Sequence, residues 1–311
     1  MKKYLVTGGA GFIGSHLVRA LLEQGAFVRV LDDFSTGKPE NLAGLNLDLV
    51  EGDVRDASRV AQAVQGVDIV FHEAAFVSVP QSMQDPTGCF DINQRGTETL
   101  LEAARKQGVA RVVLASSAAV YGDSQALPLD EETLLRPSSP YAVSKRVDEI
   151  YADLYTRSFG LQVAALRYFN VYGPRQRPDS MYAAAVPIFA RRLLDGKPIT
   201  IYGDGGQTRD LIYIGDVIRA NLAASEHPAA PGQVFNVCTG VETKVTDLVE
   251  TLVGFFPSAG APQYAEARPG DIYRSVGSPQ KATAVLGFSA QSSLADGLKA
   301  VVDWMKAESR E

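Results

Sequence analysis

Cysteine and histidine are scarce in this sequence of 311 residues, which contains two cysteines and three histidines. Cys89 and Cys238 lie far apart in the chain, and the histidines are scattered. None of these residues has the spacing of a metal site. We therefore expect no metal centre, two packed thiols rather than ligands, and a reducing compartment.

Long apolar runs and excess positive charge are also missing. No stretch approaches the ~18 apolar residues of a membrane span, and the apolar run after Met1 is too short for a signal peptide. The formal net charge is -6, whereas a general nucleic-acid binder is usually basic. These absences predict a cytoplasmic protein that binds neither membrane nor nucleic acid. An anionic small molecule is still compatible with this charge, provided that arginines converge locally.

The first half of the chain alternates short apolar runs with helical patterns. Strands are expected at 3–7, 27–31, 47–52, 68–72, 111–116 and 161–167, and helices at 13–24, 58–64, 93–106 and 141–158. Strands that alternate with helices indicate βαβ units and a parallel sheet covered on both faces. The sequence therefore predicts an α/β protein with a Rossmann-type, doubly wound parallel sheet.

The rhythm changes after residue 167, where proline and glycine become more frequent. Helices are expected at 184–194, 216–225, 246–255 and 293–307, and residues 234–237 are apolar enough to return to the main sheet. We expect a smaller α/β substrate-binding lobe. Residues 1–167 with about 211–239 would form the cofactor-binding domain, and about 168–210 with 240–311 the second lobe.

A glycine-rich turn follows the first expected strand. Gly8, Gly11 and Gly14 are spaced three apart, and a helix is expected to begin near Phe12 and Ile13. Such a turn lets backbone N–H groups approach a pyrophosphate, which the positive end of the helix then attracts. Glycines alone are weak evidence, but the strand before them and the helix after them predict a dinucleotide site.

Acidic residues end the next two strands. Asp32, followed by Asp33, stands where a carboxylate accepts hydrogen bonds from the adenosine ribose and repels a 2′-phosphate, which favours NAD over NADP. The alternative is that both residues only form a turn. Asp53 ends the third strand. For that residue a contact with adenine and a turn role are both open.

A serine, a tyrosine and a lysine form the candidate catalytic set. Ser117 ends the fifth strand, and Ser139-Pro140 is a favourable start for a helix that carries Tyr141 and Lys145 four residues apart. A free tyrosine is too weakly acidic to act as a base at neutral pH, and an ammonium group nearby stabilises its phenolate. Chance also produces Tyr–Lys pairs at this spacing, but the glycine loop and the serine favour catalysis.

These motifs resemble the extended short-chain dehydrogenase/reductase family, and within it the UDP-hexose 4-epimerases, over essentially the whole chain. The stretch from Arg167 to Pro174 and the short motifs around Asp204, Arg209 and Arg268 strengthen the likeness. The resemblance implies a bound NAD, a UDP-sugar substrate, an isomerase activity and a homodimer built from the helices at 93–106 and 141–158.

The resemblance also implies roles for residues outside the motifs. Further cofactor contacts would come from Phe12, Ile13, Val54, Ala74, Ala75, Asn93, Tyr141 and Lys145. The substrate would be held by Ser78, Asn170, Thr200, Tyr202, Arg209, Arg268, Asp271 and Ser275, in addition to Ser117 and Tyr141. Guanidinium groups suit phosphate oxygens, although each arginine taken alone is as compatible with a surface salt bridge.

The sequence departs from the family pattern at two positions. Val77 stands where many relatives carry a lysine, and Ser275 stands where some carry a bulky aromatic residue. A small residue at 275 would leave room for a 2-acetamido group, so we expect use of both UDP-glucose and UDP-N-acetylglucosamine. Three alternatives are a 4,6-dehydratase, a 4-reductase and a non-catalytic NAD or UDP-sugar sensor. Ala118 and Ala119 argue against the first, because that branch carries carboxylates there.

Overall fold

The computed structural model describes residues 1–177, 185–257, 260–267 and 272–309. Its central element is a seven-stranded sheet in the order β11-β6-β5-β4-β1-β2-β3. All neighbouring strands in this sheet are parallel. The strands are β1 (Lys3–Thr7), β2 (Phe27–Asp32), β3 (Asp48–Glu51), β4 (Ile69–His72), β5 (Arg111–Ser117), β6 (Gln162–Tyr168) and β11 (Val234–Val237).

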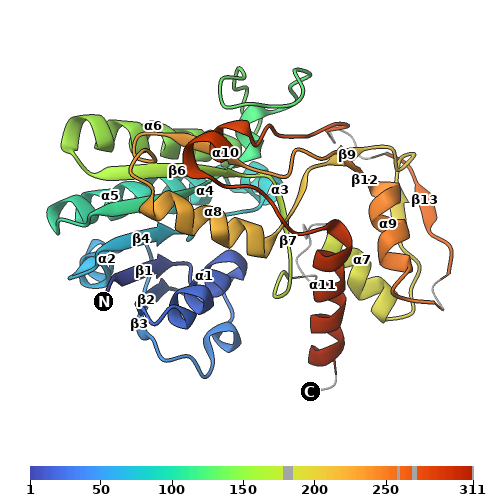
Figure 1. The fold of residues 1–311 in the computed structure, drawn as a ribbon, viewed down its shortest axis with the longest axis horizontal. Coiled ribbons are helices and arrows are strands. Elements are labelled where there is room, and N and C mark those ends of the chain that lie inside the picture. The colour runs from blue at the N-terminus through green and yellow to red at the C-terminus, as the bar shows by residue number, and fades with distance from the viewer. Residues whose placement is uncertain (178–184, 258–259, 268–271, 310–311) are drawn as a thin grey trace.

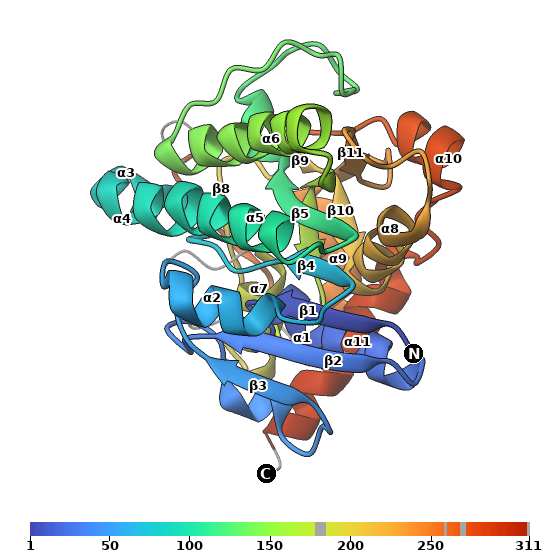
Figure 2. The same cartoon turned by 90° about the vertical axis from the view of Figure 1, so that its left-hand side faces the viewer.

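Helices cover both faces of the sheet (Figure 2). One face carries α1 (Phe12–Glu23) and α8 (Ile214–Glu226), and the other carries α2 (Ala57–Val64), α5 (Gly96–Lys106) and α6 (Pro140–Phe159). Alternate residues of β1 enter different cores: Val6 packs with Leu17 on the α1 side, and Leu5 packs with Leu100 on the α5 side. The predicted doubly wound α/β fold is confirmed, including the return of residues 234–237 to the sheet.

The smaller lobe lies at one end of the sheet (Figure 1). Its core joins α7 (Ala185–Leu194), α9 (Val245–Val253) and α11 (Leu294–Glu308) through side chains such as Phe189, Leu252 and Val302. The chain after β6 also forms three two-stranded sheets: β7 (Asn170–Tyr172) with β10 (Leu211–Tyr213), β9 (Thr208–Arg209) with β12 (Thr243–Lys244), and β8 (Thr200–Tyr202) with β13 (Gln263–Ala265).

Three helices were not predicted. They are α3 (Val79–Gln84), α4 (Pro86–Phe90) and α10 (Gln280–Leu286). The helix expected at 93–106 is preceded by a π-helical turn, Asp91–Arg95, and α5 begins at Gly96. Ala282 and Leu286 of α10 pack into the core on the α1 and α8 side of the sheet. The exact division into two domains stays a prediction.

The described residues form neither a membrane-spanning helix nor a cluster of metal ligands. None of their helices has both the length and the apolar character needed to cross a membrane. They also contain no group of three or more His, Cys, Asp or Glu side chains suited to a metal ion.

Candidate functional site

The glycine turn between β1 and α1 is too tight for side chains. Gly8 has a φ of +66°, and a Cβ there would lie 2.7 Å from the backbone nitrogen of Ala74. A Cβ on Gly14 would lie 2.2 Å from the carbonyl oxygen of Gly8. The three glycines therefore let β1, the first turn of α1 and the end of β4 approach one another. This places the N-terminus of α1 at the carboxyl edge of the sheet, where the sequence predicts a pyrophosphate.

Asp32 links the glycine turn to the loop that follows β2. Its buried carboxylate accepts hydrogen bonds from the backbone nitrogens of Ala10, at 2.8 Å, and Phe34, at 2.9 Å. Burial raises the pKa of Asp32, and these two N–H groups oppose that rise. Asp33 accepts from the hydroxyl and backbone nitrogen of Ser35. The carboxylate of Asp32 thus shapes the loop in which its predicted ribose contact would be made.

Arg55 is a partner of Asp53 that sequence reasoning missed. Its guanidinium pairs with the Asp53 carboxylate, and this hydrogen bonding lowers the pKa of Asp53. The two residues are only two positions apart, so this ion pair is local and agrees with the turn role considered for Asp53. Val54, between them, is buried. The adenine contact of Asp53 stays a prediction.

Helix α6 begins as the sequence predicts. Ser139 caps it by accepting a hydrogen bond from the backbone nitrogen of Ala142 at 3.1 Å, and Pro140 occupies the first turn. Tyr141 is partly buried, and Lys145, one turn further on, is 3% exposed. The two side chains interact electrostatically. Ser117 lies at the end of β5, where its hydroxyl accepts from the backbone nitrogen of Ala119.

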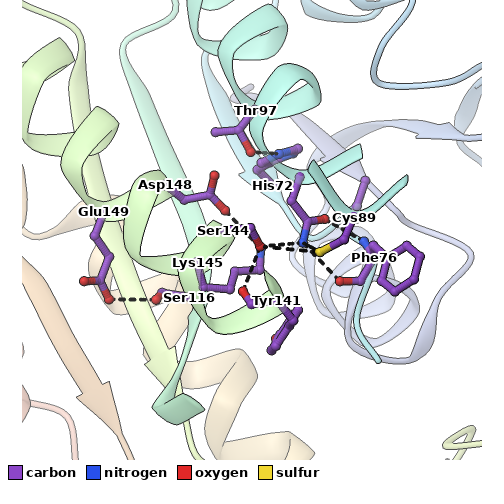
Figure 3. Close-up of polar contacts among 12 residues, drawn as sticks. His72, Phe76, Cys89, Thr97, Ser116, Tyr141, Ser144, Lys145, Asp148 and Glu149 are labelled. Atoms are coloured by element: carbon purple, nitrogen blue, oxygen red, sulfur yellow. Dashed lines mark hydrogen bonds and ion pairs between the residues drawn. The ribbon is translucent and has the colours of Figure 1, made fainter. Parts of the chain in front are cut away.

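Asp148 is a buried counter-ion of Lys145, three residues further along α6 (Figure 3). The Nζ–Oδ2 distance is 3.2 Å, and the side chains are 4% and 3% exposed. Burial alone lowers the pKa of Lys145, but nearby groups, first the carboxylate of Asp148 and then Tyr141, more than offset this, so the pKa lies above its ordinary value. Burial raises the pKa of Asp148 to about 6. Asp148 was not among the residues predicted from the sequence.

The imidazole of His72, the last residue of β4, lies between two threonine hydroxyl groups. His72 Nδ1 lies 2.7 Å from the hydroxyl of Thr7, and its Nε2 lies 3.1 Å from that of Thr97 (Figure 3 shows the second contact). The Thr7 hydroxyl also accepts a hydrogen bond from the backbone nitrogen of Ala74. Burial, reinforced by the charge of Lys145, lowers the pKa of His72 to about 3. His72 is therefore neutral and fixes the loop that starts at Glu73.

Asn93 fastens the loop after β4 to α6. Its side-chain oxygen accepts from the backbone nitrogen of Phe76 at 2.7 Å, and its nitrogen donates to Ser144 at 2.8 Å. Ser144 in turn donates to the carbonyl oxygen of Tyr141. Ala74 and Ala75 are partly buried in this loop, and Ser78 caps α3 through the backbone nitrogen of Gln81. The cofactor and substrate contacts of these residues stay predictions.

A buried ion pair supports the opposite side of α6. Glu149 binds the guanidinium of Arg167 at 2.7 and 2.9 Å and accepts from the Ser116 hydroxyl at 2.7 Å. Arg167 also donates to the phenol oxygen of Tyr121, which donates to Asn236. This network joins β5, β6, β11 and α6. It therefore fixes the strand ends from which Ser117 and the lobe segments emerge.

The smaller lobe brings several predicted substrate residues to one edge. Asn170 begins β7, and its backbone nitrogen donates to the carbonyl oxygen of Asp210. The buried carboxylate of Asp210 accepts from the backbone nitrogens of Thr239, Gly240 and Gly277. It thus ties three loops together beside Arg209 and the partly buried Ser275.

The other residues predicted to bind the substrate lie on β8, on β9 and in a segment outside the described residues. Thr200 and Tyr202 form the ends of β8, and Tyr202 is 38% exposed. Arg209 donates to the carbonyl oxygen of Thr208. Arg268 and Asp271 lie outside the described residues. The substrate contacts of all these residues stay predictions.

A glycine turn at a helix N-terminus, beside a tyrosine–lysine pair at the carboxyl edge of a parallel sheet, defines a Rossmann-type enzyme of nucleotide cofactors. The chain belongs to the NAD dependent epimerase/dehydratase family, whose model matches residues 4–238.

Three solved structures of similar proteins match over nearly their whole length. A Thermotoga maritima UDP-glucose 4-epimerase with UDP-glucose is 38% identical, with a TM-score of 0.94 over 99% of this chain and 100% of its own. A Thermus thermophilus UDP-glucose 4-epimerase with NAD is 39% identical, with a TM-score of 0.89 over 98% and 99%. A Methanobrevibacter ruminantium UDP-N-acetylglucosamine 4-epimerase, in complex with UDP-N-acetylmuramic acid, is 36% identical, with a TM-score of 0.94 over 99% of each chain.

Proposed function

We propose that this protein is an NAD-dependent 4-epimerase of UDP-hexoses, which inverts the sugar C4 hydroxyl through a transient 4-keto sugar. The observation that carries the proposal is the placement of Tyr141 and the buried Lys145 on one face of α6, next to the strand end that bears Ser117. Full-length similarity to UDP-sugar 4-epimerases supports it.

The residues around the glycine turn fit NAD. A Cβ at Gly14 would collide with the backbone of Gly8 and Gly9, so α1 packs on β1 as closely as a dinucleotide-binding turn requires. Asp32 supplies a carboxylate of the kind that favours a ribose with a free 2′-hydroxyl. NAD, when bound, supplies the group that accepts hydride from the sugar C4 and returns it.

The chain itself supplies the proton chemistry. Tyr141 takes the proton of the 4-hydroxyl as a general base, and the Lys145 ammonium stabilises negative charge on the tyrosine oxygen. Ser117 holds the same sugar oxygen. Inversion requires the sugar to present its other face, so the UDP must be held firmly by the smaller lobe while the sugar is held loosely. Asn170, Arg209, Thr200 and Tyr202 are the residues proposed for this anchor.

The three alternative functions, a 4,6-dehydratase, a 4-reductase and a sensor, fit the site less well. A 4,6-dehydratase needs an acid and a base to remove water, and Ala118 and Ala119 follow Ser117 at the relevant strand end. A reductase would consume the nicotinamide. A sensor has no use for a lysine buried beside a tyrosine.

The test uses the purified protein with no added NAD. Proton NMR should show UDP-glucose converting to UDP-galactose, and mass spectrometry should find NAD carried by the protein. Turnover that needs stoichiometric added NAD would refute the epimerase. Addition of UDP-sugar with no formation of reduced nicotinamide absorbance would favour a sensor.

A wider substrate range is the finer part of the proposal. Ser275 is small and partly buried, and it comes four residues after Asp271, which is predicted to bind the substrate, so we expect space for a 2-acetamido group there. Assays of the Ser275→Tyr variant with UDP-glucose and UDP-N-acetylglucosamine test this. Selective loss of the N-acetyl activity is expected, and equal retention of both activities contradicts this pocket.

We also propose a homodimer in the cytoplasm. Val143, Ile150 and Leu154 are 43%, 49% and 39% exposed on α6, and their spacing of seven and four residues places them on one helical face. A two-fold copy would cover this stripe. Analytical ultracentrifugation of wild type and Ile150→Glu tests the dimer. The two buried free cysteines are compatible with a reducing compartment, and localisation of a tagged chain checks that.

A further inference from the structure

Glu73 and Asn221 both place a side-chain oxygen within hydrogen-bond distance of the single hydroxyl of Tyr168. Glu73 follows β4 directly, and its Oε1 lies 2.8 Å from the phenol oxygen of Tyr168 at the end of β6. The same phenol oxygen lies 3.0 Å from Oδ1 of Asn221 in α8. The Nδ2 of Asn221 donates to the carbonyl oxygen of Val217 at 2.9 Å, and this contact fixes the amide so that its oxygen faces Tyr168.

A neutral phenol has one hydrogen to donate. An ionised Glu73 and the amide oxygen of Asn221 would both need that hydrogen, so one of two close oxygen–oxygen contacts would lack a proton. A buried polar group without its partner costs about 1–3 kcal/mol. A protonated Glu73 removes the conflict, because Glu73 then donates to Tyr168 and Tyr168 donates to Asn221.

We propose that Glu73 is a positioning residue that must be a neutral carboxylic acid, and that its ionisation switches off the Lys145–Tyr141 pair. This inference rests on the proposed epimerase function and concerns the same site. No proton transfer to or from Glu73 is part of the reaction.

The electrostatic environment explains why the charge matters. Among the described residues, the titratable groups that face Glu73 are Tyr168 from β6 and Lys145 from α6. Lys145 is already paired with Asp148. A second carboxylate would leave two negative charges against one ammonium, and it would therefore oppose negative charge on the Tyr141 oxygen.

The titration range of Glu73 agrees with this geometry. Burial raises the pKa of Glu73 to about 7, and the hydrogen bond from Tyr168 and the charge of Lys145 only partly oppose the rise. Burial also raises the pKa of Tyr168 well above that of a free phenol, so Tyr168 keeps its hydrogen. A rise in pH through the neutral range would therefore convert Glu73 from the neutral to the charged form.

The experiment compares the pH dependence of kcat/KM in wild type, Glu73→Gln and Glu131→Gln. Wild type should lose activity above neutral pH, with a limiting slope of about tenfold per pH unit for a single inactivating ionisation. Glu73→Gln keeps a neutral group that can donate to Tyr168, so this alkaline limb should disappear while activity near pH 6 persists. Glu131 is the matched control: burial raises its pKa too, but it does not face Lys145, so its variant should keep the wild-type limb.

A second measurement is independent of activity. Carbon-13 NMR of labelled glutamate side chains should show one carboxyl that titrates near neutral pH in wild type and is missing from Glu73→Gln. An alkaline limb shared by wild type and Glu73→Gln overturns the proposal, and so does a Glu73 carboxyl that is already ionised at pH 6. If the wild type epimerises nothing at any pH, the proposed function fails instead, and the NMR titration still decides the charge of Glu73.

Discussion

The ammonium of Lys145 lies 3.2 Å from Oδ2 of Asp148, and both side chains are buried on α6 (Figure 3). Asp148 therefore partly offsets the positive charge that Lys145 presents to Tyr141. A catalytic lysine without this counter-ion would stabilise the phenolate more strongly, although it would itself be harder to keep charged in a buried position.

Replacement of Asp148 by asparagine should shift the acid limb of kcat/KM to lower pH, by on the order of one pH unit. It should also lower stability by up to about 3–5 kcal/mol, because a buried ammonium loses its partner. The pH profile separates this role from a purely structural one. Asp153→Asn, which removes an exposed ion pair with Arg157 on the same helix, should leave the acid limb unchanged. An acid limb that Asp148→Asn does not move would contradict the role.

Tyr141→Phe should lower kcat by about 10²–10⁴, the usual contribution of a general base. The fold should be retained, since the partly buried aromatic ring is unchanged. The measurement is NMR of UDP-sugar interconversion together with a thermal melt. Tyr151→Phe removes a phenol from the same helix, ten residues further on, and should keep full activity. Normal turnover by Tyr141→Phe would remove the basis of the functional proposal.

The sequence was sufficient to predict structural features that follow a regular pattern or that depend on residues close together in the chain. Apolar runs located all seven strands of the main sheet, because buried parallel strands are nearly continuous in hydrophobicity, although the edge strand β3 buries only Val50. The Ser139-Pro140 start of α6 was also predictable, since a cap depends only on residues three apart. Helices α3 and α4 were missed because they have six and five residues, too few to show a helical period.

The electrostatic partners of the site could not be predicted in the same way. Tyr168 contacts Glu73, 95 positions away in the sequence, and Asn221, 53 positions away, and no local pattern predicts such contacts. Asp148 was within reach, because a carboxylate three residues after a lysine on a helix is a common ion pair. Its burial, which gives the pair its importance, depends on how α6 packs on the sheet.

Glu149→Gln should destabilise the protein by about 3–5 kcal/mol, because it leaves the buried guanidinium of Arg167 without a charged partner. The Glu149 and Arg167 side chains are 0% and 3% exposed. Urea unfolding measures the effect. The exposed pair of Lys299 with Asp303 is the comparison, and Asp303→Asn should cost less than about 1 kcal/mol. Equal effects of the two variants would show that burial of the Glu149 pair adds nothing.

Acid should weaken the fold through His72. Its pKa is about 3 in the folded protein and close to 6.5 in an unfolded chain, so below about pH 6.5 only the unfolded state takes up the proton. Its contribution to stability is therefore complete above pH 6.5 and falls by about 1.4 kcal/mol per pH unit as the pH drops towards 3. Denaturation between pH 7 and 4 should show a shallower slope for His72→Gln than for wild type. His227→Gln, in the turn after α8, should keep the wild-type slope.

Gly14→Ala should damage both the fold and cofactor binding. The added Cβ would lie 2.2 Å from the carbonyl oxygen of Gly8 and 2.8 Å from the Cα of Gly9. Both are backbone atoms of the turn, so neither can move aside as a flexible side chain could. Overpacking of this kind costs about 1–3 kcal/mol, occasionally more, and here the strain falls on the turn proposed to hold the pyrophosphate.

The purified Gly14→Ala variant should therefore melt at a lower temperature and carry less NAD than wild type. Added NAD should raise its melting temperature less than it raises that of wild type from which the cofactor has been stripped. Gly260 offers a matched substitution, because a Cβ there meets no atom within 4 Å, and Gly260→Ala should change neither property. A Gly14→Ala protein with normal cofactor content would mean that α1 can move away from β1, and the pyrophosphate would then have to be held by other parts of the chain.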